Sequence, residues 1–422
     1  MNPAGLVAAL IVSIGSLMLR AQDSSTSSSF KLDHFTFDFG SQPELPALAT
    51  SSRIQVSATN LYSADIGYGF EPGATITTGA SATSDQPFYF SVKLPEGNYR
   101  VTVALGGDSA ATTTVKAELR RLMLEKVHTE AGQTATHSFI VNLRTPEISD
   151  HNQVHLKPRE QTTEMWDWDD KLTLEFNGIH PSVHFLKIDP VKVSTVFLTG
   201  DSTVCDQPAE PWNSWGQMLP RFLKPDVAVA NHAESGETVA DSLRAQRFEK
   251  IFSLMQPGDY LFVQFGHNDM KNRATNALAV YKSDLKKVIA RTRLLGGTPV
   301  LVTSMERKAG VDHDTLAGYP AAVREVAGQE GCALIDLNQM SRVFYRALGP
   351  DLNKAFQDGT HHNNYGSYEL AKCVVTGIQQ DHLPLAASIV DNFSFDPAHP
   401  DPVADFTMPP SPNVSTLRPL GN

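Results

Sequence analysis

The stretch VSTVFLTGDST, residues 193–203, decides the fold of the larger part of this chain. Its first six residues are mostly apolar or β-branched, which is typical of a buried strand. Similar runs recur downstream, at 227–230, 260–265, 300–303 and 333–336. Helical patterns lie between and after them, at 239–254, 277–295, 319–330, 338–348 and about 365–383. Strands that alternate with helices predict an α/β fold, in which helices cover both faces of a parallel sheet.

The sequence before this stretch has a different pattern. From about residue 30 to 190, apolar and polar residues mostly alternate, and glycine and proline mark the turns. Many short strands of this kind predict an all-β sandwich. Residues 88–94 and 99–103 flank the turn Pro-Glu-Gly-Asn and predict a hairpin, whereas the polar residues 145–170 predict a long loop.

Both ends of the chain carry sequence outside these two parts. An apolar run at 6–19, followed by Ser/Thr-rich sequence, predicts a signal peptide over residues 1–22 and a secreted or periplasmic protein. The first residues lack Lys and Arg, so an uncleaved N-terminal anchor is the alternative. No later run is long and apolar enough for a membrane span. Residues 391–422 are rich in proline and predict an extended tail along the surface.

The composition limits the classes of function. A chain of 422 residues with 41% hydrophobic and 19% charged residues is globular and has room for two domains. Its net charge of -11 argues against a nucleic-acid partner, but a local basic groove for an anionic polysaccharide stays compatible with it. Cys205, Cys332 and Cys373 are too few for a disulfide scaffold, although a Cys332–Cys373 bridge stays open. No ligand cluster with metal spacing is visible, so we expect no cofactor.

Four short polar blocks carry the chemistry, in one order: Gly-Asp-Ser-Thr at 200–203, Ser-Gly-Glu-Thr at 235–238, Gly-His-Asn-Asp at 266–269 and Asp-Gly-Thr-His at 358–361. The first three follow predicted strands, so they should meet at the carboxyl edge of the sheet. A serine hydrolase needs a nucleophile, a base, a group that orients the base and donors for an oxyanion. The four blocks contain all of these parts.

The first and last blocks hold the nucleophile and the base. Ser202 lies at a strand-to-helix turn, where its hydroxyl is able to project above the sheet; the alternative is a helix cap. Asp358 and His361 are three residues apart, so one loop presents the carboxylate to one nitrogen of the imidazole while the other nitrogen faces Ser202. His362 is the rival base, and a His-His pair is also able to bind a metal.

The second and third blocks hold the donors. The Asn268 side chain carries an amide that is able to donate to an oxyanion, and Gly236 lets a backbone N–H approach a substrate closely. Each residue alone is equally typical of a turn. His267 and Asp269 flank Asn268 and are expected to hold its loop.

These blocks and their surroundings resemble the SGNH (GDSL-like) hydrolases, and among them the rhamnogalacturonan acetylesterase family of carbohydrate esterases. The resemblance covers about residues 193–390 and includes further motifs, among them TGDSTV at 199–204, WGQML at 215–219, NHAESGET at 231–238, PGDYLFVQFGHND at 257–269 and YPAAVR at 319–324. It implies a flavodoxin-like hydrolase domain over residues 193–390. One departure is that many members have Gly-Arg-Ser where this chain has Gly236, Glu237 and Thr238.

The resemblance also implies roles for the residues of the blocks. Ser202, Asp358 and His361 would form the catalytic triad, and the Ser202 N–H, Gly236 and Asn268 the oxyanion hole. The implied reaction is removal of acetyl groups from rhamnogalacturonan through an acyl-enzyme. An acetylesterase for xylan or another polysaccharide is the alternative, and an inactive carbohydrate-binding protein is an alternative of another class.

The resemblance extends to the strand-rich part of the chain. Some multidomain relatives carry an N-terminal β-sandwich like a galactose-binding module, which fits residues 30–190. Whether this part binds sugar or braces the hydrolase stays open.

Overall fold

The computed structural model describes residues 35–40 and 53–419. All of these described residues belong to one compact unit of the chain. The predicted signal peptide, residues 1–22, lies outside the described residues.

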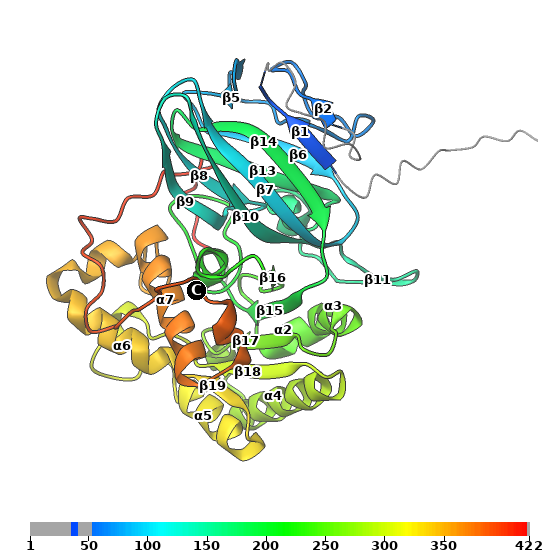
Figure 1. Ribbon diagram of the computed structural model, residues 1–422. Coiled ribbons are helices and arrows are strands. Elements are labelled where there is room, and N and C mark those ends of the chain that lie inside the picture. Colours follow the sequence, from blue (N-terminus) through cyan, green and yellow to red (C-terminus); the bar gives the residue numbers. More distant parts are fainter. Residues whose placement is uncertain (1–34, 41–52, 420–422) are drawn as a thin grey trace, which may run out of the picture. The chain divides into compact units, whose positions relative to one another are not determined.

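The described residues between 35 and 190 form two large sheets of mostly antiparallel strands (Figure 1). The first sheet has the order β10 (Gln133–Leu143), β7 (Gly97–Gly107), β14 (Ser182–Pro190), β1 (Phe35–Asp38) and β2 (Arg53–Gln55), with β5 (Ala82–Thr83) and β4 (Thr77–Thr78) attached to β14. The second has the order β3 (Tyr68–Phe70), β6 (Phe88–Lys93), β13 (Lys171–Ile179), β8 (Ala111–Ala117) and β9 (Arg121–Thr129).

The two sheets share one apolar core, as a sandwich requires. Phe37 from the first sheet packs edge-on against Phe90 from the second, with ring centroids 5.1 Å apart. Both side chains are fully buried in a cluster that draws on both sheets. Alternation along the strands places these aromatic residues inward, and the predicted β-sandwich is confirmed.

The predicted hairpin is wrong. β6 pairs with β3 and β13, whereas β7 pairs with β10 and β14 in the other sheet. The turn at 95–98 therefore carries the chain across the sandwich, and Tyr99 closes it through a hydrogen bond from its hydroxyl to the Pro95 carbonyl at 2.7 Å. Strand pairing here depends on residues about 80 positions later in the sequence, which a local turn pattern does not reveal.

The predicted long loop carries short regular elements. They are a small hairpin of β11 (Glu147–Ser149) and β12 (Asn152–Gln153) and two 3-10 turns, η1 (Pro158–Gln161) and η2 (Met165–Asp167).

The second half of the chain contains a parallel five-stranded sheet. Its order is β16 (Val227–Asn231), β15 (Ser194–Gly200), β17 (Tyr260–Gln264), β18 (Thr298–Val302) and β19 (Ala333–Ile335). In chain order this is 2-1-3-4-5, the flavodoxin-like arrangement, and the expected fold class is confirmed. In such a sheet the order in which the strands are added reverses between the first and third strands in the sequence. Ligands bind at this point, outside the carboxyl ends of the strands.

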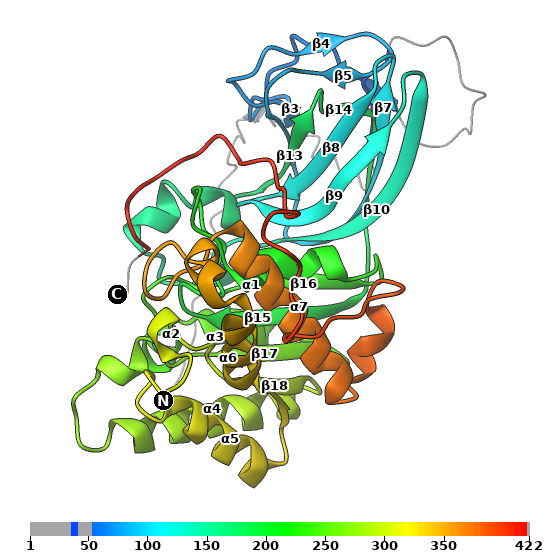
Figure 2. The ribbon, with the colours of Figure 1, turned by 90° about the vertical axis from the view of Figure 1, so that its left-hand side faces the viewer.

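Helices cover both faces of this sheet (Figure 2). They are α1 (Trp215–Met218), α2 (Val239–Arg244), α3 (Arg247–Leu254), α4 (Ala277–Leu294), α5 (Tyr319–Glu330), α6 (Leu337–Leu348) and α7 (Asn364–Gln380). Shorter 3-10 turns are η3 (Leu219–Phe222), η4 (Asp269–Lys271), η5 (Lys308–Gly310), η6 (Gly349–Ala355) and η7 (Pro384–Ser388). The single helix predicted at 239–254 is wrong, because Gln246 has a φ of 61° and separates α2 from α3.

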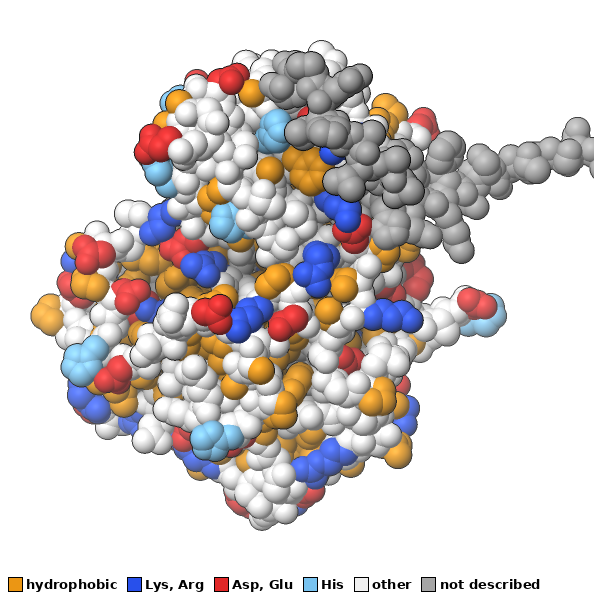
Figure 3. Space-filling model, in the orientation of Figure 1, with side chains coloured by type: hydrophobic (Ala, Val, Ile, Leu, Met, Phe, Trp, Pro, Cys, Tyr) orange, Lys and Arg blue, Asp and Glu red, His pale blue; other side chains and the backbone are white. Residues whose placement is uncertain are grey.

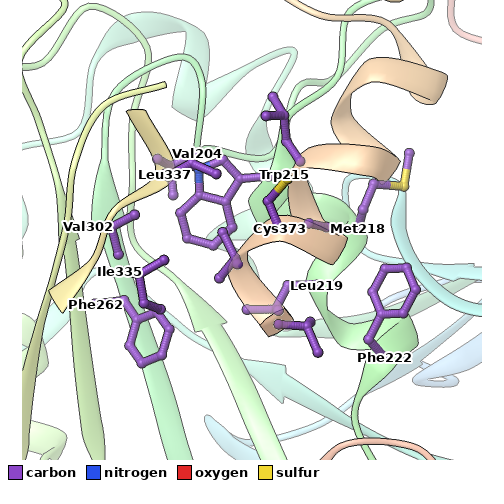
Figure 4. Close-up of a cluster of buried hydrophobic side chains, with 14 of the residues drawn as sticks. Val204, Trp215, Met218, Leu219, Phe222, Phe262, Val302, Ile335, Leu337 and Cys373 are labelled. Carbon is purple, nitrogen blue, oxygen red and sulfur yellow. The ribbon is translucent and has the colours of Figure 1, made fainter. Parts of the chain in front are cut away.

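Alternate residues of β15 supply two separate apolar cores. Val196 and Leu198 belong to the same cluster as Trp215 and Cys373, on the face covered by α1, α6 and α7. Figure 4 shows part of this cluster, with Trp215 and Cys373 labelled. Phe197 points to the opposite face, where α2 to α5 contribute side chains such as Phe248. The nearly continuous burial of β15 explains why its sequence is apolar at successive positions.

The cysteines of this part form no bridge. Cys205, Cys332 and Cys373 are free, and the Cys332 thiol donates to the Pro299 carbonyl at 3.2 Å. The open alternative of a Cys332–Cys373 disulfide is therefore ruled out by the structure.

Among the described residues, no helix combines the length and apolarity needed to cross a membrane.

Candidate active site

Ser202 lies in a tight turn directly after β15. The backbone N–H groups of Val204 and Cys205 donate to the Asp201 carbonyl at 2.9 and 3.0 Å, and the Asp201 carboxylate accepts from both donors of Thr203. These bonds reverse the chain within one turn and place Ser202 at the carboxyl end of the sheet.

The turn packs closely against the neighbouring strand. A Cβ at Gly200 would lie 2.5 Å from a Val204 methyl group and 2.7 Å from the Gln264 carbonyl of β17, so only glycine fits. The Gln264 side chain donates to the Thr203 hydroxyl and accepts from the Trp215 indole, both at 2.8 Å. A buried amide thus fixes the underside of the Ser202 turn.

His267, from the third block, also supports this turn. Its Nδ1 lies 3.3 Å from Asp201 Oδ2, and its Nε2 bonds to the Met305 carbonyl at 3.0 Å. Burial acts to raise the pKa of Asp201, but His267 and the Thr203 donors outweigh it, so the pKa lies below its usual value. An ionised Asp201 therefore links the Ser202 turn to the loop that carries Asn268.

The structure brings Ser202, His361 and Asp358 into one hydrogen-bonded chain. His361 Nε2 lies 2.8 Å from Ser202 Oγ, and His361 Nδ1 lies 2.9 Å from Asp358 Oδ2. Burial alone would raise the pKa of Asp358, but the bonds from the His361 ring and from the backbone N–H groups of His361 and Thr360 lower it well below its usual value. An ionised Asp358 holds the proton on Nδ1, which leaves Nε2 to accept the serine proton.

His362, the rival base, faces another way. Its Nε2 bonds to the Tyr345 hydroxyl at 2.8 Å, and its ring packs against Tyr345 and Phe356. Burial lowers its pKa to about 3, so the ring is neutral at ordinary pH. Within residues 35–40 and 53–419, no group of three or more His, Cys, Asp or Glu side chains is placed to hold a metal ion.

Gly236 and Asn268 follow β16 and β17 and meet beside the Ser202 turn. Gly236 has a φ of 79°, a backbone conformation that favours glycine. Asn268 Nδ2 donates to the carbonyl of Glu237, the residue after Gly236, at 3.1 Å. Lys271 donates to Asn268 Oδ1 at 2.8 Å and so fixes which end of the amide is the donor. The amide nitrogen has two hydrogens, and in the described part of the chain Glu237 accepts just one of them.

Asp269, the other neighbour of Asn268, ties this loop to the next helix. Its carboxylate accepts from the Val239 N–H at the start of α2, at 3.1 Å, and its carbonyl accepts from the Tyr319 hydroxyl at 3.0 Å.

The strand-rich part of the chain reaches the second block. Lys157 and Arg159 both donate to the Ser235 carbonyl. Lys157 also pairs with Glu237, and Arg159 with Glu234. Glu237 is 2% exposed and bound to a lysine from the strand-rich part.

A cavity of about 340 Å³ has walls that include Trp212, a neighbour of His361, and Arg418, a neighbour of Asp358. Its walls come from four separate segments of the sequence: Arg159, Thr163 and Glu164; Gln207, Pro208, Ala209 and Trp212; Ser235; and Asn413, Val414, Ser415, Leu417, Arg418 and Pro419. Trp212 joins this cavity to the triad, because its ring lies edge-on against His361 with centroids 5.7 Å apart. Apart from Ser235, which begins the second block, the blocks did not predict these walls, and no local motif marks them.

Comparisons with known proteins place this geometry in context. The chain matches the GDSL-like lipase/acylhydrolase family over residues 198–367, which include all four blocks. It is 34% identical to rhamnogalacturonan acetylesterase RhgT of Bacillus subtilis over 218 residues, 46% of this chain and 94% of that protein. The uncharacterized esterase YxiM of Bacillus subtilis is 27% identical over 374 residues, 82% of this chain and 91% of that one. A crystal structure of YxiM covers 83% of this chain and 99% of its own, with 24% identity and a TM-score of 0.46.

Proposed function

The chain belongs to the GDSL-like lipase/acylhydrolase family, and we propose that it is a secreted or periplasmic acetylesterase that deacetylates rhamnogalacturonan in pectin. The hydrogen-bonded chain from Ser202 through His361 to Asp358 is the observation that carries this proposal. Export is supported by the apolar run at 6–19.

In the proposed first step, Ser202 Oγ attacks the acetyl carbonyl while His361 Nε2 takes its proton. Asp358 keeps the imidazole in the required tautomer and stabilises the imidazolium that forms. His361 then returns the proton to the sugar oxygen as the C–O bond breaks, and an acetyl-serine remains. Water attacks this ester with the same base, and acetate leaves.

The negative charge that develops on the acetyl oxygen needs donors. We assign this role to the backbone N–H groups of Ser202 and Gly236 and to the second N–H of Asn268. All three residues lie just beyond the carboxyl ends of adjacent strands. Donors fixed in advance stabilise the transition state without reorganisation, which is the main advantage of such a site over water.

The choice of polymer rests on the relatives. RhgT is named a rhamnogalacturonan acetylesterase, and this chain spans 94% of its length at 34% identity. An esterase for acetylated xylan is the alternative within the same chemistry. An inactive carbohydrate-binding protein is the alternative of another class, and the aligned Ser202, His361 and Asp358 argue against it.

Acetate release from a panel of polymers tests the proposal. The purified full chain should release acetate from acetylated rhamnogalacturonan with a higher kcat/KM than from acetylated xylan. Ser202→Ala, with its melting temperature checked, is the control for background hydrolysis. Faster release from xylan would contradict the pectin assignment, and equal rates for the wild type and Ser202→Ala would contradict the assignment of the nucleophile.

A further inference from the structure

The Pro-rich C-terminal segment is held to the rest of the fold by hydrogen bonds to buried charged side chains. We call residues 409–419 the C-terminal strap. Ser411 is 2% exposed; its hydroxyl donates to Glu175 and accepts from Lys116 at 2.7 Å, and its N–H donates to Glu210 at 3.1 Å. Lys116 also donates to the Pro409 carbonyl at 3.0 Å. The strap is therefore anchored at Ser411, a contact that the sequence did not predict.

Beyond Ser411 the strap follows the segment that leads away from the Ser202 turn. Glu210 exchanges backbone hydrogen bonds with Asn413 and Ser415, each at 2.8 Å. The Trp212 indole donates to the Ser415 carbonyl at 2.9 Å. Because Trp212 also packs on His361, the position of the strap is fixed relative to the proposed base.

The strap forms one wall of the cavity that Trp212 lines and places a cation there. Arg418 lines this cavity, and its side chain is 66% exposed. Its Nε lies 3.7 Å from Asp358 Oδ2, which is longer than a hydrogen bond, so this contact does not occupy the five guanidinium N–H donors. Arg159 lines the same cavity but is 19% exposed and bound to Glu164, Glu234 and the Ser235 carbonyl.

We propose that Arg418 binds a carboxylate of the substrate and so makes the esterase selective for acetylated glycans that contain uronic acid. The inference rests on the proposed function, which supplies a substrate with galacturonate residues. A guanidinium matches a carboxylate with two parallel hydrogen bonds, and the contact is charge-assisted. The cavity volume of about 340 Å³ lies within the range of small-ligand sites.

The test is Arg418→Gln in the full chain, assayed with acetylated rhamnogalacturonan and with acetylated xylan oligosaccharides, which lack a uronate. We expect the ratio of the two kcat/KM values, acidic over neutral, to fall roughly tenfold, since one charge-assisted contact is lost. The loss should lie mainly in KM for the acidic substrate, and methyl esterification of its carboxylates should reproduce it in the wild type. Arg346→Gln, an exposed arginine of α6 paired with Asp312, should keep the wild-type ratio.

The outcomes separate this inference from the function on which it rests. An unchanged ratio in Arg418→Gln would overturn it, and so would an equal fall on both substrates, because Arg418 would then act through Asp358 rather than on the glycan. If the wild type releases acetate from xylan but none from rhamnogalacturonan, the proposed function fails and the uronate assignment fails with it. A melting temperature within error of the wild type excludes a folding defect in each comparison.

Discussion

The strand-rich part, residues 35–190, and the α/β part, residues 194–383, are both stabilised internally by apolar packing. The contact between the two parts adds another kind of interaction, the buried ion pair. Each has its own apolar core, built from the inward faces of its sheets and helices. Their contact contains buried ion pairs: Glu160 binds Arg247 through two bonds of 2.9 and 2.6 Å, and Arg121 pairs with Asp206 at 2.8 Å.

These contacts favour a bracing role for the strand-rich part. The buried charges between the two parts tie it to segments that come after the first two blocks in the sequence, since Asp206 follows the Ser202 turn and Arg247 begins α3. Leu122 of β9 also joins the core of the α/β part. On the surface shown in Figure 3, in contrast, charges of both signs are interspersed and face water. The four blocks thus lie in one part, whereas the walls of the cavity come from both.

The largest expected effect is the loss of activity when the proposed base in the α/β part, His361, is removed. His361→Ala should lower kcat by ~10⁴ or more, as loss of a triad member does in serine hydrolases. His362→Ala removes a ring bonded to Tyr345 and should lower the melting temperature while retaining far more activity. Steady-state kinetics and thermal denaturation of both variants distinguish the two histidines, and an inactive but stable His362→Ala would reverse the assignment.

The pH profile of the wild type adds a check on the base. Activity should fall on acidification, since only a neutral imidazole accepts the serine proton. Asp358, whose pKa is lowered, stays ionised through this fall, so kcat/KM should follow a single protonation.

The next effect tests whether the ionic contact holds the two parts together. Glu160→Ala leaves Arg247 buried, at 1% exposure, without its carboxylate, and should lower the free energy of unfolding by about 3–5 kcal/mol. Glu130→Ala removes an exposed carboxylate paired with His128 and should leave the midpoint of urea unfolding near that of the wild type. Equal midpoints for the two variants would show that the buried pair contributes little.

The sequence predicted the fold wherever a local pattern determines it. The apolar run at 193–198 forms β15, because a strand buried on both faces is apolar at successive positions. The alternating sequences form a sandwich, because a strand buried on one face is apolar at every second position. The hairpin at 88–103 failed, since the same turn is able to join two strands of one sheet or of two sheets. The break at Gln246 depends on a left-handed backbone at a residue with no strong preference for it.

The same distinction applies to the site. Ser202, Gly236, Asn268, Asp358 and His361 sit in compact blocks, so their chemistry is visible in the sequence. Arg159, Trp212 and Arg418 come from the strand-rich part, the segment after the Ser202 turn and the C-terminal strap, and only the tertiary fold brings them to one cavity. No spacing relates them, and ion pairs that hold them, such as Arg159 with Glu234, join residues with no periodic relation.

A smaller chemical effect tests the oxyanion donor. Asn268→Ala should lower kcat by roughly 10²–10³ with a lesser effect on KM, because the amide acts on charge that develops in the transition state. Asn268→Asp retains the shape but removes the N–H donor, and is the matched variant. An unchanged kcat with a raised KM would make Asn268 a binding residue instead.

The smallest expected effect concerns the pH dependence of stability inside the α/β part. Burial raises the pKa of Asp269 to about 7 from a usual value of 3.8, and the nearby Asp201 adds to the shift. A raised folded-state pKa means that the carboxyl stabilises the fold fully at acid pH and loses this contribution as the pH rises through about 7. Asp269→Asn keeps an oxygen for the Val239 N–H but does not ionise. The melting temperature of the variant minus that of the wild type should therefore increase from pH 4 to pH 8, as thermal denaturation at several pH values would measure. A difference that stays level or decreases would mean that Asp269 is already ionised in the folded protein, and that the loop of Asn268 is held by a charge rather than by a neutral acid.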